Sequence, residues 1–464
     1  MGDKKDLSTN DVNLMYVFFI SFVAALGGFL FGYDTAVISG TVGFLRSYFN
    51  LAPAMLGWAV SCALVGCILG VSVAGYLSDK FGRKNVLILS AALFFVGAVG
   101  TALPKTFEQF ILFRILGGMG IGVASMISPL YIAEVSPRHL RGRMVTLYQL
   151  AITTGIVLVY FVNYFIAGIS DEAWGIQYGW RIMFGSGTIP ALFFLSLIFV
   201  VPKSPRWLVK KDKNDKAMSV LTKIEGETLA RVEMKAIKET LKEKDAPIKE
   251  LFKPGLRAVL FIGIILAVFQ QATGINSVIY YAPEIFKLIG GTTTNSALFQ
   301  TAMVGTINML FTVIALFTVD KWGRKPLMLS GATSMGICLL CLGIVFYVDA
   351  VGAWVLPIVL LAIASFAYSL GPVTWVVISE IFPNRIRGRA VSIAILCLWG
   401  ANYVVSQTFP MMNENAWLIA KFNHAFPFWV YALFCIMNAI FIFIFVPETK
   451  NKSLEEIEKI WVKQ

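Results

Sequence analysis

Long apolar segments separated by short polar ones run along most of the chain. Each is about as long as, or longer than, the 20 or so residues that an α-helix needs to cross the hydrocarbon of a bilayer. Their order predicts twelve spans, at residues 14–39, 55–77, 86–103, 107–132, 144–167, 181–201, 256–288, 296–319, 327–348, 355–381, 390–411 and 426–446. We therefore expect an all-α membrane protein, because a helix satisfies its own backbone hydrogen bonds inside a membrane.

Two motifs occur twice at nearly the same spacing. DKFGRK at 79–84 recurs as DKWGRK at 320–325, an offset of 241 residues. AEVSPRHLRGR at 133–143 recurs as SEIFPNRIRGR at 379–389, an offset of 246 residues. Such a duplication predicts two six-helix halves of the same orientation, with a substrate site midway between them. We place the N-terminal half at 1–202, and the C-terminal half with a short tail at 255–464.

The polar stretch 203–254 separates the two halves. Apolar residues recur in it at helical spacing, as at Met218, Leu221 and Ile224, between charged residues. This pattern predicts short amphipathic helices on the cytoplasmic face. A passive linker and a gating segment are both compatible with it.

Composition and charge agree with a membrane protein. Charged residues make up 14% of the chain and the mean hydropathy is +0.74, whereas soluble domains carry about 25% charged residues. The net charge of +12 does not indicate nucleic-acid binding, because the Lys and Arg residues lie in short loops between apolar segments. Loops rich in these residues alternate with loops that have few, which predicts a cytoplasmic (inner) membrane protein with both termini in the cytoplasm.

A carboxylate, Asp34, falls inside the first span, in FGYDTAVISG. A charge at the bilayer centre costs roughly 2.5–3.5 kcal/mol on insertion scales and usually has a function. Arg114 in the fourth span stays charged and is a good partner for a carboxylate. Pairing favours the charged carboxylate and burial favours the neutral one, so the site can exchange a proton. A purely structural ion pair is the alternative.

Three amide side chains fall within seven residues of the seventh span. They are Gln270, Gln271 and Asn276 in FQQATGIN, where Gly274 permits a break in the helix. Amides donate and accept hydrogen bonds without carrying charge, which suits the hydroxyl groups of a sugar. Hydrogen bonding between helices, worth about 0.6 kcal/mol in membranes, is the alternative.

Taken together, these motifs resemble those of the sugar porter family of the major facilitator superfamily. FGYDTAVISG, DKFGRK, PKSPRWL, FQQATGIN, GPVTWVVISEIFPNRIRGR, NYVVSQTFP and VPETK follow one another along the chain. Within the family the chain is most similar to bacterial D-xylose–proton symporters, because Asp34 follows FGY. The resemblance implies the major facilitator fold and import of a monosaccharide, D-xylose first, with protons by alternating access.

The resemblance also implies roles for individual residues. Asp34 would be the proton acceptor and Arg114 its partner. Sugar binding would fall to Gln149, Gln270, Gln271, Asn276, Asn308, Trp375, Phe31, Tyr280, Gly371 and Trp399. A cytoplasmic charge network that gates the transporter would comprise Arg83, Glu134, Arg141, Arg324, Glu380 and Arg387. Lys203 stands where relatives have Glu, whereas Glu448 is retained, so we expect a weaker network in the first half.

Two departures from the xylose-type pattern leave the sugar open. Leu398 and Ile156 occupy positions where that subgroup has glutamines. Hexoses (glucose, galactose) and arabinose therefore remain alternative substrates, and a facilitative uniporter remains an alternative mechanism. No nucleophile–base set, metal-ligand cluster or phosphate-binding loop appears in the sequence, so we expect neither an enzyme nor a metal or cofactor site. The expected partners are a monosaccharide, protons and the lipid bilayer, without nucleic acid, and the expected state is a monomer.

Overall fold

The computed structural model describes residues 12–137, 140–242, 251, 253, 256–288, 293–382 and 386–450. Twelve helical segments in it are long and apolar enough to cross a membrane. The prediction of an all-α protein with twelve membrane spans is confirmed.

Six spans form the first half of the chain. Five are single helices: α1 (Leu14–Phe49), α2 (Pro53–Phe81), α3 (Arg83–Ala102), α4 (Phe107–Val135) and α5 (Arg141–Ala167). The sixth is built from α6 (Glu172–Trp174), the π-helix η2 (Gly175–Gly179), α7 (Trp180–Ser186) and α8 (Thr188–Leu197). Two further helices follow, α9 (Pro205–Lys210) and α10 (Asn214–Lys242), and α10 is kinked at Gly226.

The second half supplies the other six spans. Its helices are α11 (Leu256–Ala272), α12 (Ile275–Lys287), α13 (Thr294–Trp322), α14 (Arg324–Tyr347), α15 (Val355–Ser365), the π-helix η4 (Phe366–Leu370), α16 (Gly371–Ile381), α17 (Arg387–Asn413), α18 (Ala416–Phe422) and α19 (Phe426–Phe445). The seventh span combines α11 with α12, and the tenth combines α15, η4 and α16.

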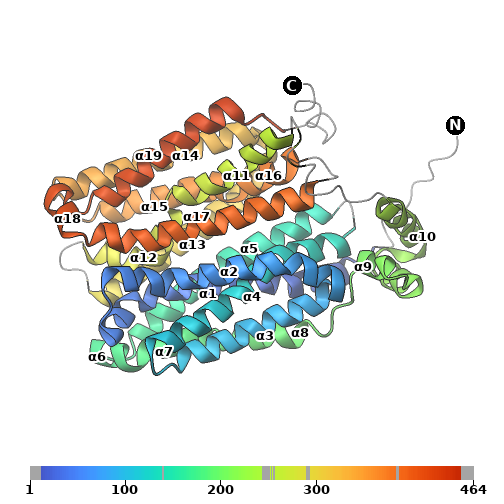
Figure 1. Ribbon diagram of the computed structural model, residues 1–464, viewed down its shortest axis with the longest axis horizontal. Coiled ribbons are helices and arrows are strands. Elements are labelled where there is room, and N and C mark those ends of the chain that lie inside the picture. Colours follow the sequence, from blue (N-terminus) through green and yellow to red (C-terminus); the bar gives the residue numbers. More distant parts are fainter. Residues whose placement is uncertain are drawn as a thin grey trace.

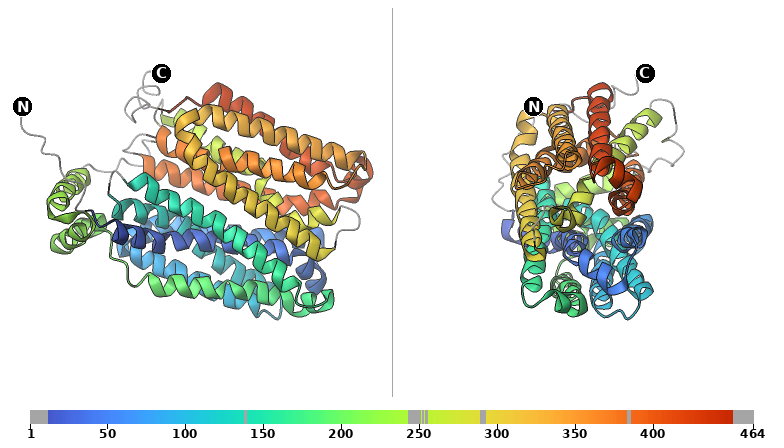
Figure 2. Two further views of the ribbon diagram at one scale, coloured as in Figure 1. Left: turned by 180° about the vertical axis from the view of Figure 1, so that it is seen from behind. Right: turned by 90° about the vertical axis from the view of Figure 1, so that its left-hand side faces the viewer.

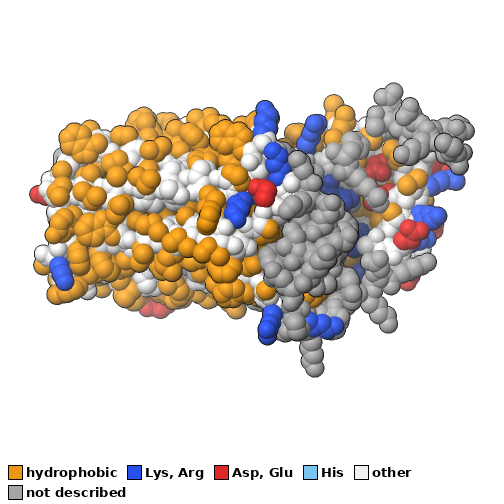
Figure 3. All heavy atoms as spheres, turned by 90° about the horizontal axis from the view of Figure 1, so that it is seen from above, with side chains coloured by type: hydrophobic (Ala, Val, Ile, Leu, Met, Phe, Trp, Pro, Cys, Tyr) orange, Lys and Arg blue, Asp and Glu red, His pale blue; other side chains and the backbone are white. Residues whose placement is uncertain are grey.

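The two halves lie side by side with their helices roughly parallel (Figures 1 and 2). Helices α9 and α10 lie beyond one end of the bundle, which we call the linker end; the short α6 and α18 lie at the opposite end. Apolar side chains cover most of the face seen in Figure 3, and Lys and Arg gather toward the linker end. This distribution is that of a membrane-embedded bundle with a basic margin.

Local sequence explains where several helices begin. Asn13 and Thr106 accept hydrogen bonds from backbone N–H groups of the first turns of α1 and α4, as short polar residues do at helix N-caps. Gly82 and Gly323, the equivalent glycines of the repeated motif, have φ values of 89° and 92° and begin α3 and α14. A residue with a side chain is strained in that conformation, so glycine is required at both turns.

Some span boundaries differ from those predicted. The first helix continues to Phe49 rather than ending near residue 39, and Asn50 ends it in the left-handed conformation. The predicted seventh and tenth spans are interrupted, at Gly274 and at residues 366–370. These breaks place backbone carbonyl groups inside the bundle, where a side chain can bind them.

Contacts between the halves close the bundle at the opposite end. Arg46 at the end of α1 pairs with Glu414 just after α17. Gln407 of α17 accepts a hydrogen bond from Ser61 at 2.8 Å and donates one to the carbonyl oxygen of Ala54 at 2.9 Å. Helices α2 and α17 approach closely, because a Cβ atom added at Gly57 would lie 2.4 Å from the carbonyl oxygen of Gln407. The halves are therefore packed directly against each other at this end.

Candidate functional site

Asp34 and Arg114 form an ion pair inside the first half. The distance between Arg114 Nη1 and Asp34 Oδ2 is 2.9 Å, and the side chains are 2% and 18% exposed, respectively. The guanidinium of Arg114 also lies over the ring of Phe184, 5.3 Å from its centroid. The predicted pairing is thus present, and it joins α1 to α4 within one half.

The amides of the seventh span form a chain of hydrogen bonds at the helix break. Asn276 donates to Gln271, which donates to Gln270 at 3.3 Å. Gln270 donates in turn to the carbonyl oxygens of Leu370 and Gly371, at 2.9 and 3.0 Å. The Gln270 amide therefore ties the break in the seventh span to the break in the tenth.

Gly274 makes the first of these breaks possible. It has a φ of 79°, and a Cβ atom added there would lie 2.4 Å from the ring of Tyr431. Both the backbone conformation and the lack of space require glycine. The break turns Asn276 onto the start of a new helix while Gln270 and Gln271 end the previous one.

Aromatic side chains from both halves lie in the middle of the bundle. The rings of Phe31 in α1 and Trp399 in α17 are 5.5 Å apart, so this contact crosses between the halves. Trp399 is buried, and its Nε1–H has no hydrogen-bond partner among the described groups. Trp375 of α16 is 36% exposed, which leaves part of its ring open to contact with a bound molecule.

Tyr280 connects the aromatic and the ionic groups. Its phenol accepts a long hydrogen bond from Asn402, at 3.5 Å, and its helix α12 packs against α1, which carries Asp34. Asn402 is buried and also accepts from Ser406 at 3.1 Å. Sequence reasoning missed Asn402, although NYVVSQTFP places it three residues after Trp399.

The two remaining predicted sugar-binding residues lie on neighbouring helices of different halves. Gln149 is half-buried in α5, and Asn308 is buried in α13. These helices touch where Thr154 donates to the sulfur of Met309, at 3.8 Å. Helices of both halves thus carry the predicted sugar-binding residues.

The predicted gating charges form the same arrangement in each half. Arg83 pairs with Glu134 at 3.0 Å, and Ser204 also donates to that carboxylate. In the second half Arg324 pairs with Glu380 at 3.1 Å, and Thr449 donates to Glu380 at 2.6 Å. Each of these described pairs joins helices of one half.

Ser204 and Thr449 were not predicted, although PKSPRW and VPETK place them at equivalent positions of the repeat. Arg141 is exposed at the start of α5, and among the described residues no acid pairs with it. Arg387 begins α17, but its side chain lies outside the described residues.

The charge reversal at Lys203 changes the start of one helix. Glu448 accepts hydrogen bonds from the N–H groups of Arg324 and Lys325, both at 3.1 Å, at the start of α14. Its counterpart Lys203 instead lies over the ring of Trp207, with Nζ 5.2 Å from the centroid. The Arg83–Glu134 distance of 3.0 Å is close to the 3.1 Å of its second-half counterpart, and the weaker network that we expected in the first half stays a prediction.

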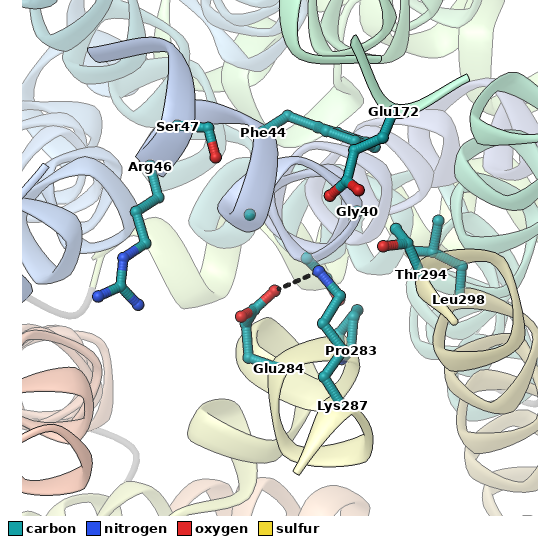
Figure 4. A pocket seen from close by; sticks show the side chains of 12 residues that line it. Gly40, Phe44, Arg46, Ser47, Glu172, Pro283, Glu284, Lys287, Thr294 and Leu298 are labelled. Atoms are coloured by element: carbon teal, nitrogen blue, oxygen red, sulfur yellow. Dashed lines mark hydrogen bonds and ion pairs between the residues drawn. The ribbon is translucent and has the colours of Figure 1, made fainter. Parts of the chain in front are cut away.

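A cavity of about 160 Å³ lies near the opposite end, between α1, α6, α12 and α13 (Figure 4). Glu284 and Lys287, an ion pair of 3.1 Å, line one side of it, and Glu172 and Arg46 also line it. None of the predicted sugar-binding residues lines this cavity. A second cavity, of about 10 Å³, lies against Asp34.

Comparisons with known proteins agree with this arrangement. The sequence profile of the family "Sugar (and other) transporter" matches residues 20–461. The D-xylose-proton symporter of Escherichia coli (strain K12) is 48% identical, covering 97% of this chain and 96% of that protein. The arabinose-proton symporter of Bacillus subtilis (strain 168) is 44% identical, covering 98% of this chain and 97% of that protein.

Among solved structures, the inward open conformation of the xylose transporter from E. coli superposes with a TM-score of 0.84 at 45% sequence identity. The alignment covers 96% of this chain and all of that one. The match along nearly the whole chain places this protein in the family of sugar (and other) transporters.

Proposed function

We propose that this protein imports a monosaccharide together with protons by alternating access, with D-xylose as the first candidate. The observation that carries the proposal is the Asp34–Arg114 ion pair inside the helix bundle, in which the arginine is buried and the carboxylate stays partly exposed. Charged side chains inside a membrane are costly and rare, and those that are present usually have a function. The names of the two symporter relatives supply the sugar and proton chemistry.

In this proposal Asp34 accepts the proton and Arg114 is released from it. An ionised carboxylate binds the guanidinium strongly, and a neutral carboxyl group binds it weakly. Protonation therefore loosens the contact between α1 and α4. Because α12 of the second half, which carries Tyr280, packs against α1, a rearrangement of α1 reaches the candidate sugar site.

Sugar binding falls to the amide and aromatic residues described above. Gln149, Gln271, Asn276 and Asn308 supply the amides, and Trp375 and Phe31 offer aromatic faces. Tyr280 and Trp399 line the site, while Gln270 and Gly371 hold the two helix breaks together. Leu398 and Ile156 are both buried. Because these apolar side chains cannot make the hydrogen bonds of the glutamines in the xylose-type pattern, hexoses and arabinose remain alternative substrates.

The two halves move against each other around this site. We assign residues 1–202 and 255–464 to the moving halves and 203–254 to the segment that joins them. The charge clusters Arg83–Glu134 and Arg324–Glu380, with Arg141 and Arg387, act at the gate of the linker end. In this proposal the basic loops, this end and both termini face the cytoplasm, and the protein works in the inner membrane as a monomer.

Uptake into proteoliposomes tests the proposal. Purified protein is given D-xylose, L-arabinose, D-glucose or D-galactose, with and without an imposed pH gradient. We expect D-xylose to accumulate above its external concentration only when the gradient is present. If a different sugar accumulates, that sugar takes the place of D-xylose as the proposed substrate. If uptake does not depend on the pH gradient, the protein is a uniporter.

A further inference from the structure

A small cavity lies beside Asp34, and none of the predicted sugar-binding residues lines it. Its volume is about 10 Å³, and residues of α1, α3 and α7 line it together with Gly187, which lies between α7 and α8. The lining residues that matter here are Tyr33, Asp34, Ala98, Phe184 and Gly187. All belong to the first half, and none was predicted to bind sugar.

Polar groups around this cavity have unused hydrogen-bonding capacity. Oδ2 of Asp34 accepts from Arg114, but no described residue donates to Oδ1. Nε of Arg114 is buried without a partner among the described groups, and this guanidinium stacks on Phe184, which walls the cavity. Asp34 lines the cavity and its carboxylate is partly exposed, and an acceptor oxygen in such a place commonly binds an ordered water molecule.

Tyr33 adds an acceptor to the cavity wall. Ser186 donates its hydroxyl proton to the carbonyl oxygen of Met183, at 2.6 Å. The 2.7 Å contact between the hydroxyls of Tyr33 and Ser186 therefore uses the proton of Tyr33. The oxygen of Tyr33 remains able to accept a hydrogen bond from a water molecule in the cavity.

We propose that this cavity holds one water molecule that delivers protons to Asp34 and removes them, apart from the path of the sugar. A cavity needs a volume of about 10–15 Å³ to hold one water molecule, and this cavity is at the lower end of that range. A proton on that water passes to the carboxylate, where an O–H bond forms, and leaves a neutral water behind. The reverse transfer restores the carboxylate and its contact with Arg114.

The groups that act on Asp34 are few. Arg114 faces it from α4, Tyr33 precedes it on α1, and Cys62 and Cys67 of α2 and Tyr280 of α12 are within electrostatic reach. Thiols and phenols are neutral below about pH 8. Arg114 is therefore the charge that Asp34 feels among the described side chains, and the proton on Asp34 decides whether their attraction persists.

Gly187→Ala fills the cavity with little strain. The added Cβ would lie 3.6 Å from the Tyr33 ring and 3.7 Å from Cβ of Ala98, both of which line the cavity. Its closest contact is 3.3 Å, to the carbonyl oxygen of Phe184, and the φ of −63° suits alanine. Gly185→Ala is the matched control. Its added Cβ would contact Ala102 of α3, at 3.4 Å, and Ala102 does not line the cavity.

The experiment measures two activities of the same proteoliposomes. One is sugar-driven proton entry, followed with a trapped pH dye after addition of D-xylose. The other is exchange of labelled for unlabelled D-xylose at equal pH, which needs no net proton movement. We expect Gly187→Ala to slow proton entry by about tenfold or more, as loss of an aligned proton transfer does, and to leave exchange within about twofold, while Gly185→Ala resembles the wild type.

Ala98→Val fills the cavity from the other wall and should give the same result. This inference rests on the proposed proton coupling, and the two can fail separately. Proton entry at the wild-type rate in both cavity-filling variants overturns the water site alone. Equal loss of exchange and proton entry in both variants assigns the cavity to packing and also overturns it. A wild-type protein that moves sugar without protons overturns the coupling itself.

Discussion

Arg46 of α1 and Glu414, which follows α17, form a bidentate ion pair between the two halves. Nη1 and Nη2 of the arginine lie 2.8 and 2.7 Å from the two carboxylate oxygens. The residues are 368 positions apart in the chain. Because the pair lies at the opposite end from the linker, it can form only while the halves are closed there.

Arg46→Ala should shift the protein toward the state that is open at this end. A partly exposed pair contributes up to about 1 kcal/mol, which corresponds to a population change of up to about fivefold. Spin labels at the exposed residues Met55 and Met411, in a cysteine-free background, report the separation of α2 and α17. We expect the fraction of long distances to rise.

Two further variants make that result specific. The double exchange Arg46→Glu with Glu414→Arg should restore the short distances, because it rebuilds the pair with reversed charges. Arg231→Ala removes an exposed ion pair within α10, at the linker end, so it should leave the distances unchanged. A distance distribution in Arg46→Ala that matches the wild type would contradict a closing role.

Asp34→Asn should abolish accumulation of sugar against its gradient while exchange continues. The amide resembles a protonated carboxyl group in shape and charge, so the contact with Arg114 is weakened permanently. Labelled D-xylose in proteoliposomes with an acidic exterior should reach only the external concentration. Asp171→Asn, at the exposed N-cap of α6, is the control, and intact accumulation in Asp34→Asn would exclude Asp34 as the coupling residue.

Gln270→Ala and Asn276→Ala should have different consequences although the two amides are close together. Gln270 donates both hydrogen bonds to the break in the tenth span, so its loss should cost about 1–3 kcal/mol of stability. Asn276 is half-buried, and we expect Asn276→Ala to raise the KM for sugar about tenfold, the equivalent of roughly 1.4 kcal/mol. Thermal unfolding in detergent and initial uptake rates separate the two effects, and the reverse assignment would contradict this division of roles.

Glu448 should make the stability of the protein sensitive to acid. Burial raises the pKa of Glu448. Hydrogen bonds from the N–H groups of Lys450, Arg324, Lys325 and Thr449 together lower it by more, so the pKa of Glu448 lies below the ordinary value. A carboxyl group with a lowered pKa stabilises the folded state above the unfolded pKa of about 4.3, and this contribution is lost as the pH falls through the folded value.

The measurement compares the wild type with Glu448→Gln by thermal unfolding between pH 7 and pH 3.5. At neutral pH the variant should be less stable, by about 1 kcal/mol, and the difference should shrink below about pH 4. Glu172→Gln, at an exposed position of α6, should show no such convergence. A difference that stays constant with pH would assign the effect of Glu448→Gln to packing.

Much of the fold could be predicted because its signals lie in single segments of sequence. Apolar length gives the twelve spans, and the duplicated motifs give the two halves. Asp34 and Arg114 stand out because each is a charge inside an apolar helix, so their pairing could be inferred without coordinates. The same reasoning found the amides around Gly274, since glycine marks the break locally.

Other features depend on contacts between distant segments. The tenth span breaks at residues 366–370, and the carbonyl groups freed nearby are bound by Gln270, 100 residues earlier. The Gly371–Pro372 pair that follows residues 366–370 marks this place in the sequence, but it does not reveal which side chain binds the carbonyl groups. The partners Ser204 and Thr449 were missed for a different reason: small hydroxyl residues carry little signal until the two halves are compared position by position.

The replacement of a glutamate by Lys203 leaves the duplicated halves with different responses to acid. In the second half a carboxylate holds the start of α14, and protons can discharge it. In the first half an ammonium group stacked on an indole occupies the corresponding place, and neither group takes up a proton as the pH falls. Acidification of the linker end should therefore release the start of α14 without a matching effect at the start of α3, so that a symmetric fold gives an asymmetric response.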